Sequence, residues 1–143
     1  MPLLNEQVRG QLRSMLADLR QDVELRLHPG PEGEASDVMR QLVDELAEVS
    51  RRLVPVAVPE APVVEPGRES DAEVEGPVLL VAPGGAEEAR VRFLGVTAGH
   101  EFGALVAAIR HAGEGTTELS APSVERLGAI EHRVHVQVFT TPT

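Results

Sequence analysis

The stretch 90–113 limits the possible folds more than any other part of the sequence, because a short strand pattern leads directly into an apolar helix pattern. The three-and-four spacing of one helix face is met by Phe102, Leu105, Val106 and Ile109. Thr97 is a candidate N-cap for this helix, and Gly113 is a candidate C-terminal stop. A strand that feeds such a helix predicts the closing step of an α/β sandwich.

The earlier part of the chain supplies the other elements of such a sandwich. Helix periodicity covers residues 5–20 and 36–53, and strand patterns cover residues 22–27, 54–58, 78–82 and 90–94. The strand–helix–strand order predicts that the first two strands are parallel. The glycine-rich turn between the last two strands predicts an antiparallel hairpin. We therefore expect an α/β fold with a central mixed sheet of about four strands.

Residues 59–76 differ in kind from the rest of the chain. They hold three prolines and six carboxylates against a single arginine. This composition predicts an extended, solvated loop between the second and third strands. Binding of a metal ion or of a basic partner is the alternative interpretation.

The overall composition excludes several classes of function. A net charge of −10 repels phosphate backbones, and the absence of Trp and Tyr leaves no stacking platform, so no nucleic-acid partner is expected. No apolar stretch of about 18 residues is present, so we expect no membrane span and a cytoplasmic location. The absence of cysteine excludes thiol chemistry and zinc–thiolate sites. No motif places a catalytic residue, a metal site or a cofactor.

A helix and a strand are also predicted at the C-terminal end. Ser120 can cap a short helix with Pro122 in its first turn. Val134, Val136 and Val138 then alternate with polar residues, which predicts a strand. This pair repeats the helix and strand that open the chain.

The run FLGVTAGHEFGALVAAI, residues 93–109, resembles the last strand and helix of the N-terminal thioredoxin-like unit of the alkyl hydroperoxide reductase flavoprotein subunit. It is similar also to the glutaredoxin-like family of two-unit protein disulfide oxidoreductases. The resemblance implies a thioredoxin-like three-layer sandwich with a C-terminal helix–strand extension. It divides the chain into a non-catalytic unit, residues 1–115, and the first helix and strand of a second, truncated unit, residues 116–143.

In this family the second unit carries a Cys-x-x-Cys motif directly after the strand that residues 133–143 resemble. A helix N-terminus there stabilises the attacking thiolate. Pro142 and Thr143 would lead into the missing motif, and the corresponding loop of the first unit, residues 28–35, also lacks cysteine. Three explanations stay open: a fragment, a naturally short protein, or a reading frame cut at a UGA codon for selenocysteine.

Gly76 and Pro77 occupy the position where thioredoxin-like folds place a cis-proline. By the resemblance, a cis bond there would mark a docking edge for an extended peptide. An ordinary trans proline at the start of a strand is the alternative.

The resemblance implies a cysteine-free unit of a disulfide reductase, with no cofactor of its own and no enzyme activity as the chain stands. Its expected partners are the missing catalytic thioredoxin-like unit and a peroxiredoxin or a thioredoxin-reductase-like flavoprotein. The alternative is a stand-alone protein–protein interaction module. The last strand discriminates the two: it should fray or self-associate in the first case and pack on the sheet in the second.

Overall fold

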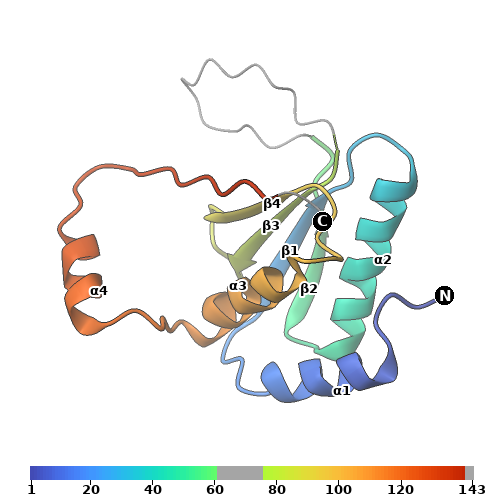
Figure 1. Cartoon of the computed structure of the whole chain (residues 1–143), viewed down its shortest axis with the longest axis horizontal. Helices are drawn as coiled ribbons and strands as arrows, with labels where there is room; N and C mark the ends of the chain where they lie inside the picture. Colours follow the sequence, from blue (N-terminus) through green and yellow to red (C-terminus); the bar gives the residue numbers. More distant parts are fainter. Residues whose placement is uncertain (61–75, 141–143) are drawn as a thin grey trace.

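The computed structural model describes residues 1–60 and 76–140, and its centre is a mixed four-stranded sheet (Figure 1). The strand order is β2-β1-β3-β4, with bounds β1 (Val23–His28), β2 (Leu53–Ala57), β3 (Val78–Pro83) and β4 (Val91–Leu94). β1 pairs with β2 in parallel and with β3 in antiparallel orientation, and β3 and β4 form an antiparallel pair. The predicted parallel pair and hairpin are therefore confirmed. Pro55 lies in β2, an edge strand, where proline is tolerated.

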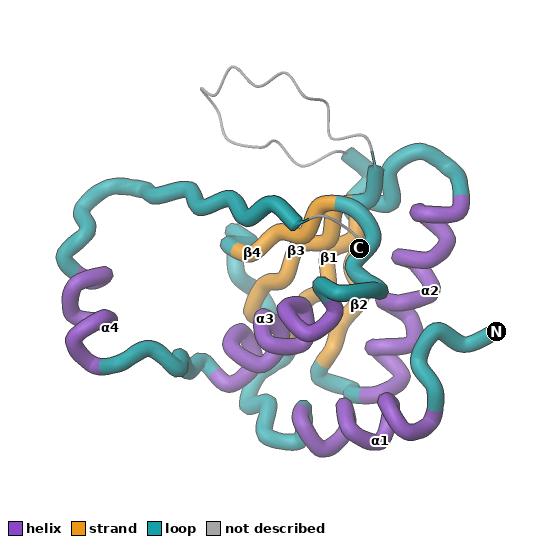
Figure 2. The backbone as a smooth tube through the Cα atoms, viewed as in Figure 1, coloured by secondary structure: helices purple, strands orange, loops and turns teal. Residues whose placement is uncertain are grey.

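Three helices pack on one face of this sheet, α1 (Glu6–Met15), α2 (Glu34–Val49) and α3 (Phe102–Glu114). The sheet residues beneath them include Val23 and Leu25 of β1, both with no exposed surface. The helices contribute apolar side chains to the same core, among them Leu12, Met39, Leu42, Leu46, Leu105 and Ile109. One continuous core therefore joins all three helices to the sheet (Figure 2).

The other face of the sheet carries no helix in the described residues. Glu24, Arg26 and His28 alternate with the core residues of β1 and point to this face. The thioredoxin-like α/β fold with a mixed sheet is confirmed. Helices α1, α2 and α3 lie on one side of the sheet in the described part of the chain.

The expected ends of α1 and α2 were wrong by several residues. α1 ends at Met15 rather than near residue 20, because the chain turns there and Leu19 enters the core. The backbone N–H groups of Arg20 and Gln21 donate to the carbonyl oxygen of Gly113 at 2.9 and 3.2 Å. α2 begins at Glu34 and ends at Val49, because Leu53 already belongs to β2.

Both predicted cap positions of α3 were also wrong. Its N-cap is Glu101, and Thr97 is fully buried, with its N–H 3.3 Å from the sulfur of Met39. Its C-cap is Gly115, in a left-handed conformation that glycine adopts without steric cost. Gly113 lies inside the last turn, where a Cβ would stand 2.5 Å from Leu19. Gly113 is therefore a packing residue rather than a helix stop.

The C-terminal residues form α4 (Ala121–Gly128), and no strand follows it in the described residues. Ser120 caps α4 as predicted, since its hydroxyl accepts from the N–H of Ser123 at 3.4 Å. The predicted strand with Val134, Val136 and Val138 is not formed, because these residues make no backbone pairing with a strand of the described sheet. We call residues 116–140 the C-terminal arm.

Glu45 fastens the N-terminal segment to α2. Its carboxylate accepts from the N–H groups of Leu3 and Leu4, each at 2.8 Å, and pairs with Arg9 at 3.0 Å. Burial by itself raises the pKa of Glu45, but these hydrogen bonds, one from Gln41, and the charge of Arg9 lower it to about 2. The charged form of this buried carboxylate is therefore the one that stabilises the fold.

Replacing Glu45 by glutamine should lower the free energy of unfolding by about 2–4 kcal/mol, because the buried N–H of Leu4, the partly buried N–H of Leu3 and one guanidinium lose a charged acceptor. Urea unfolding at neutral pH measures the loss. Glu48→Gln is the matched control, since Glu48 pairs with the same Arg9 at 2.8 Å but is largely exposed. Equal losses in the two variants would contradict the buried role of Glu45.

The same carboxylate predicts acid sensitivity. Its pKa in the folded chain, about 2, lies below the ordinary value of 4.5, so its stabilisation is complete above about pH 4.5 and is lost as the pH falls towards 2. Urea unfolding measured across this range should show a shallower pH dependence in Glu45→Gln than in the unaltered chain. Parallel curves would show that other groups carry the acid sensitivity.

Candidate functional site

The loop between β1 and α2 occupies the place where a redox motif was considered in the first unit. α2 begins after Gly33, which offers no side-chain cap, and Glu34 and Asp37 lie in its first turn. Carboxylates therefore complement the positive end of this helix dipole, where a thiolate would otherwise be stabilised. With no cysteine in the chain, this position cannot exchange disulfides. Among the described residues, no group of three His, Asp or Glu side chains could hold a metal ion.

The Gly76–Pro77 peptide bond is trans, since the described residues contain no cis bond. Of the two interpretations of Pro77, the structure therefore has the trans proline that starts a strand. Pro77 is buried, and its carbonyl oxygen accepts from the N–H of Gly95 at 2.8 Å. Gly76 is covered by Gly30, where a Cβ would lie 2.5 Å from the carbonyl carbon of Gly76. The backbone of Pro77 is thus already used within the fold.

Two other candidate residues, Pro142 and Thr143, lie outside the described residues. Residues 61–75 of the predicted acidic loop also lie outside them. The structure therefore places only the two ends of that loop.

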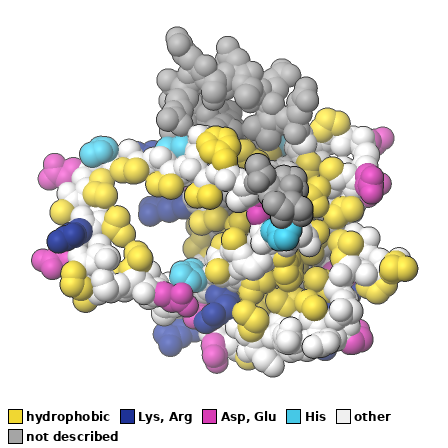
Figure 3. All heavy atoms as spheres, viewed as in Figure 1, with side chains coloured by type: hydrophobic (Ala, Val, Ile, Leu, Met, Phe, Trp, Pro, Cys, Tyr) yellow, Lys and Arg dark blue, Asp and Glu magenta, His cyan; other side chains and the backbone are white. Residues whose placement is uncertain are grey.

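The C-terminal arm exposes apolar side chains in a regular pattern. α4 has no buried residue, and the α4 stripe, formed by Val124 and Leu127 with Ile130 just beyond the helix end, is 44–53% exposed. Beyond it, Val136 is 78% and Phe139 89% exposed. Figure 3 shows hydrophobic side chains along the arm and an open gap between the arm and the body of the molecule. Monomeric proteins rarely expose apolar side chains in such continuity.

Polar contacts of Arg133 and Thr140 attach the far end of the arm to the body. Arg133 pairs with Glu88 at 3.3 Å, and the hydroxyl of Thr140 donates to the carboxylate of Glu101. Glu88 precedes β4 and Glu101 precedes α3. Residues 133–140 therefore pass alongside the hairpin without joining the sheet.

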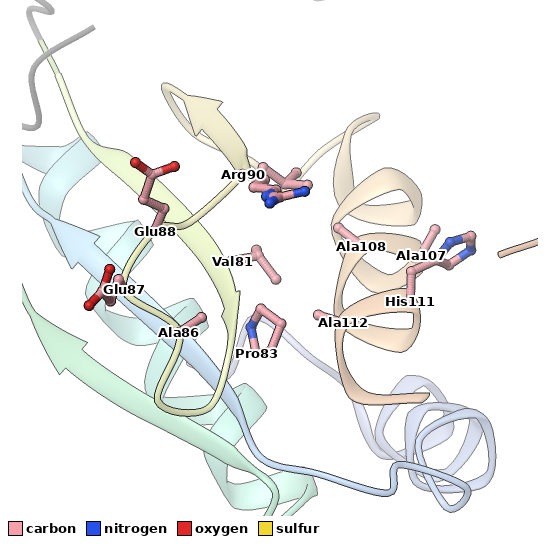
Figure 4. A pocket seen from close by; sticks show the side chains of 11 residues that line it. Val81, Pro83, Ala86, Glu87, Glu88, Arg90, Ala107, Ala108, His111 and Ala112 are labelled. Carbon is pink, nitrogen blue, oxygen red and sulfur yellow. The ribbon is translucent and has the colours of Figure 1, made fainter. Parts of the chain in front are cut away.

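A groove of about 860 Å³ lies between the β3–β4 hairpin and α3. Figure 4 shows Val81 facing Ala108 and Ala112 across it, with Glu87 and Glu88 on the turn at its rim. β4 forms one border of this groove and has β3 as its only strand neighbour in the described sheet. Sequence analysis missed this groove. Its only signal was the run of small residues in α3, which leaves space that larger side chains would fill.

The rim of the groove is held by an ion pair and several hydrogen bonds on the opposite face of the sheet. Glu24 accepts from the N–H of Gly85 at 3.1 Å and from Arg26 at 2.7 Å. These hydrogen bonds, first that of Gly85, lower the pKa of Glu24. Arg26 also donates to the carbonyl oxygens of Ala86 and Glu87. The turn that carries Glu87 and Glu88 is therefore fixed to β1.

Solved structures of alkylhydroperoxide reductase AhpF from Enterococcus faecalis (V583) have the same fold. One is the N/C-type N-terminal domain of AhpF, which matches with a TM-score of 0.68 at 22% identity, covering 87% of this chain and 59% of that chain. The other is a cysteine-to-alanine mutant of AhpF, which matches with a TM-score of 0.66 at 22% identity, covering 89% of this chain and 61% of that chain. No protein-family model and no curated protein matches.

These matches confirm the resemblance to the AhpF N-terminal domain at the level of the fold. The chain spans about three fifths of the length of each matching structure. None of the described helices is long and apolar enough to cross a membrane.

Replacing Gly30 by alanine should destabilise the fold by about 2–5 kcal/mol, because the new Cβ meets the backbone of Gly76 and Gly30 has a left-handed φ of 72°. Gly85→Ala is the matched control. Gly85 has a similar φ of 76° but nothing within 4 Å of a Cβ, so only the conformational cost of about 1–2 kcal/mol is expected. Urea unfolding of both variants isolates the contact between Gly30 and Gly76. Equal losses would show that this contact contributes nothing.

Proposed function

We propose that this chain is a non-catalytic thioredoxin-like unit of a disulfide-reducing system, which holds and docks a catalytic thioredoxin-like unit. The observation that carries the proposal is the combination of an AhpF-like fold with a chain that contains no cysteine. Such a unit has the architecture of the redox family without its thiols. Its contribution to disulfide reduction can therefore only be structural.

The C-terminal arm supports a docking role. Its alternating valines have the pattern of a strand but are exposed, so a neighbouring sheet from another unit would give them the backbone partners that they lack in the described part of the chain. This state is the one expected of a unit separated from its catalytic partner. In a stand-alone protein the same residues would pack on the chain's own sheet.

The matching structures suggest the partners of this system. They are named for alkylhydroperoxide reductase, so we propose a role in a pathway that reduces a peroxiredoxin or a similar protein disulfide through a flavoprotein. The cytoplasm is the compartment proposed, because dithiol reductases work where thiols are kept reduced.

A second candidate is a protein–protein interaction module that acts without a redox partner. The observation that favours it is the completeness of the core, which forms one cluster within residues 4–109 and needs no second unit. A module of this kind would bind its target whether or not disulfide reduction takes place.

Inactivating the gene in the source cells should slow the clearance of cumene hydroperoxide and raise the oxidised fraction of its peroxiredoxin. The intact chain should restore both, and a chain with Val136→Asp and Val138→Asp should not, because aspartate on the arm prevents docking in a sheet. Val54→Asp is the control, since Val54 is also an exposed valine but lies at the opposite edge of the sheet. Unchanged clearance and an unchanged redox state after gene loss would favour the interaction module instead.

A further inference from the structure

We infer that the C-terminal arm of one copy of this chain docks beside β4 of a second copy, which gives a two-fold dimer with exchanged arms. The inference goes beyond the proposed function, since it requires no catalytic unit. Both the receiving surface and the inserted segment belong to this chain, so the partner is a second copy of it.

The receiving surface is the groove between the hairpin and α3. Its floor is apolar, with Val81, Ala108 and Ala112 facing one another (Figure 4). Val91 of β4 also lines this groove and is 42% exposed. Because β4 ends the described sheet, an extended segment laid along it would add a fifth strand and place every second side chain over the groove.

The inserted segment is residues 133–140. Val134, Val136 and Val138 alternate, so in extended form their side chains share one face. Eight extended residues span roughly 26–29 Å. The four residues of β4 span about 13 Å. The segment therefore covers β4 completely and continues beside α3, whose 13 residues extend about 20 Å.

Charge fits the same arrangement. The turn at the rim of the groove carries Glu87 and Glu88, with Arg90 after them, and the segment begins at Arg133. The Arg133–Glu88 pair at 3.3 Å shows that these two groups are compatible partners. With a net charge of −10 two copies repel each other, so the local attraction between Arg133 and the rim sets the register of the docked arm.

The valines of the arm stay exposed within a single chain, and this favours the arm of a second copy as the segment that fills the groove. Although Arg133 and Thr140 are both attached to the chain's own body, Val136 and Val138 between them remain 78% and 82% exposed. The arm is tethered at Gly115, and the gap in Figure 3 separates it from the body. When the arms are exchanged, Arg133 of one copy can pair with Glu88 of the other. The arm then no longer has to fold back onto the chain to which it is joined.

The exposed stripe of α4 supports the two-fold arrangement. Val124, Leu127 and Ile130 remain exposed in the described part of their own chain, where α4 has no buried residue. In an isologous dimer the same surface of each copy meets its counterpart, so two α4 stripes can cover each other while the arms cross. One symmetric contact then covers both exposed parts of the arm.

Light scattering after size-exclusion chromatography tests the inference on the full chain over a wide range of concentrations. The unaltered chain should have twice the monomer mass of 15.3 kDa. The arm variant with Val136→Asp and Val138→Asp, and the groove variant Val91→Asp, should each weaken dimerisation by about tenfold or more, since each places a carboxylate in an apolar contact. Val54→Asp should leave the dimer intact, because β2 is the opposite edge of the sheet.

Mixing the two defective variants separates arm exchange from other forms of self-association. The Val91→Asp chain still has an intact arm and the arm variant still has an intact groove, so an equimolar mixture should form a heterodimer through that one contact. Thermal unfolding confirms that each variant is folded, and Ala107→Asp, at the border of the same groove on α3, replaces Val91→Asp if the latter unfolds.

Three results would overturn the inference. A monomer at all concentrations would mean that the arm closes on its own chain. A dimer that survives Val91→Asp but not the arm substitutions would mean that arms pair only with each other. A mixture of the two folded variants that stays monomeric would exclude docking of the arm in the groove. None of these results bears on the role in peroxide clearance, which the gene-loss experiment decides.

Discussion

The structure depends on β1, which lies inside the sheet and is covered by helices on one face. It pairs with β2 on one side and β3 on the other, and its residues Val23 and Leu25 are wholly buried under the helical layer. Burying a Val or Leu side chain contributes about 1.5–3 kcal/mol relative to leaving it exposed. Since α1, α2 and α3 all contribute side chains to this same core, the loss of β1 would separate β2 from β3 and open the core beneath the helices.

Two carboxylates attach segments that the apolar core does not hold. Glu45 attaches the N-terminal segment to α2, and Glu24, with Arg26, attaches the β3–β4 turn to β1. Both carboxylates accept backbone N–H groups, which keeps their charged forms favoured and lowers their pKa. The second attachment also shapes the groove, because the turn that it holds carries Glu87 and Glu88. Polar contacts of Glu24 and Arg26 on one face of the sheet therefore position the rim of the groove on the other face.

Much of the fold could be predicted because its signals are local. The apolar spacing of Leu105, Val106 and Ile109 fixed the buried face of α3, and the order of elements fixed the parallel and antiparallel pairs. Thr97 was misassigned because its hydroxyl can cap a helix in sequence but lies beside Met39 in space. The groove was missed because it lies between α3 and the β3–β4 hairpin. Its shape depends on how these elements pack, which no local sequence pattern reports.

The sequence by itself determined the order of the elements, their apolar faces and the absence of thiol chemistry, because periodicity and residue type are properties of the chain alone. Tertiary structure decided where the helices end, which face of the sheet they cover and whether the alternating valines of the arm become a strand. A cap or a strand exists only when another backbone or side chain supplies the partner atoms. Gly113 packs against Leu19, and its carbonyl oxygen accepts from the N–H of Arg20. The valines of the arm have no such backbone partners in the described sheet.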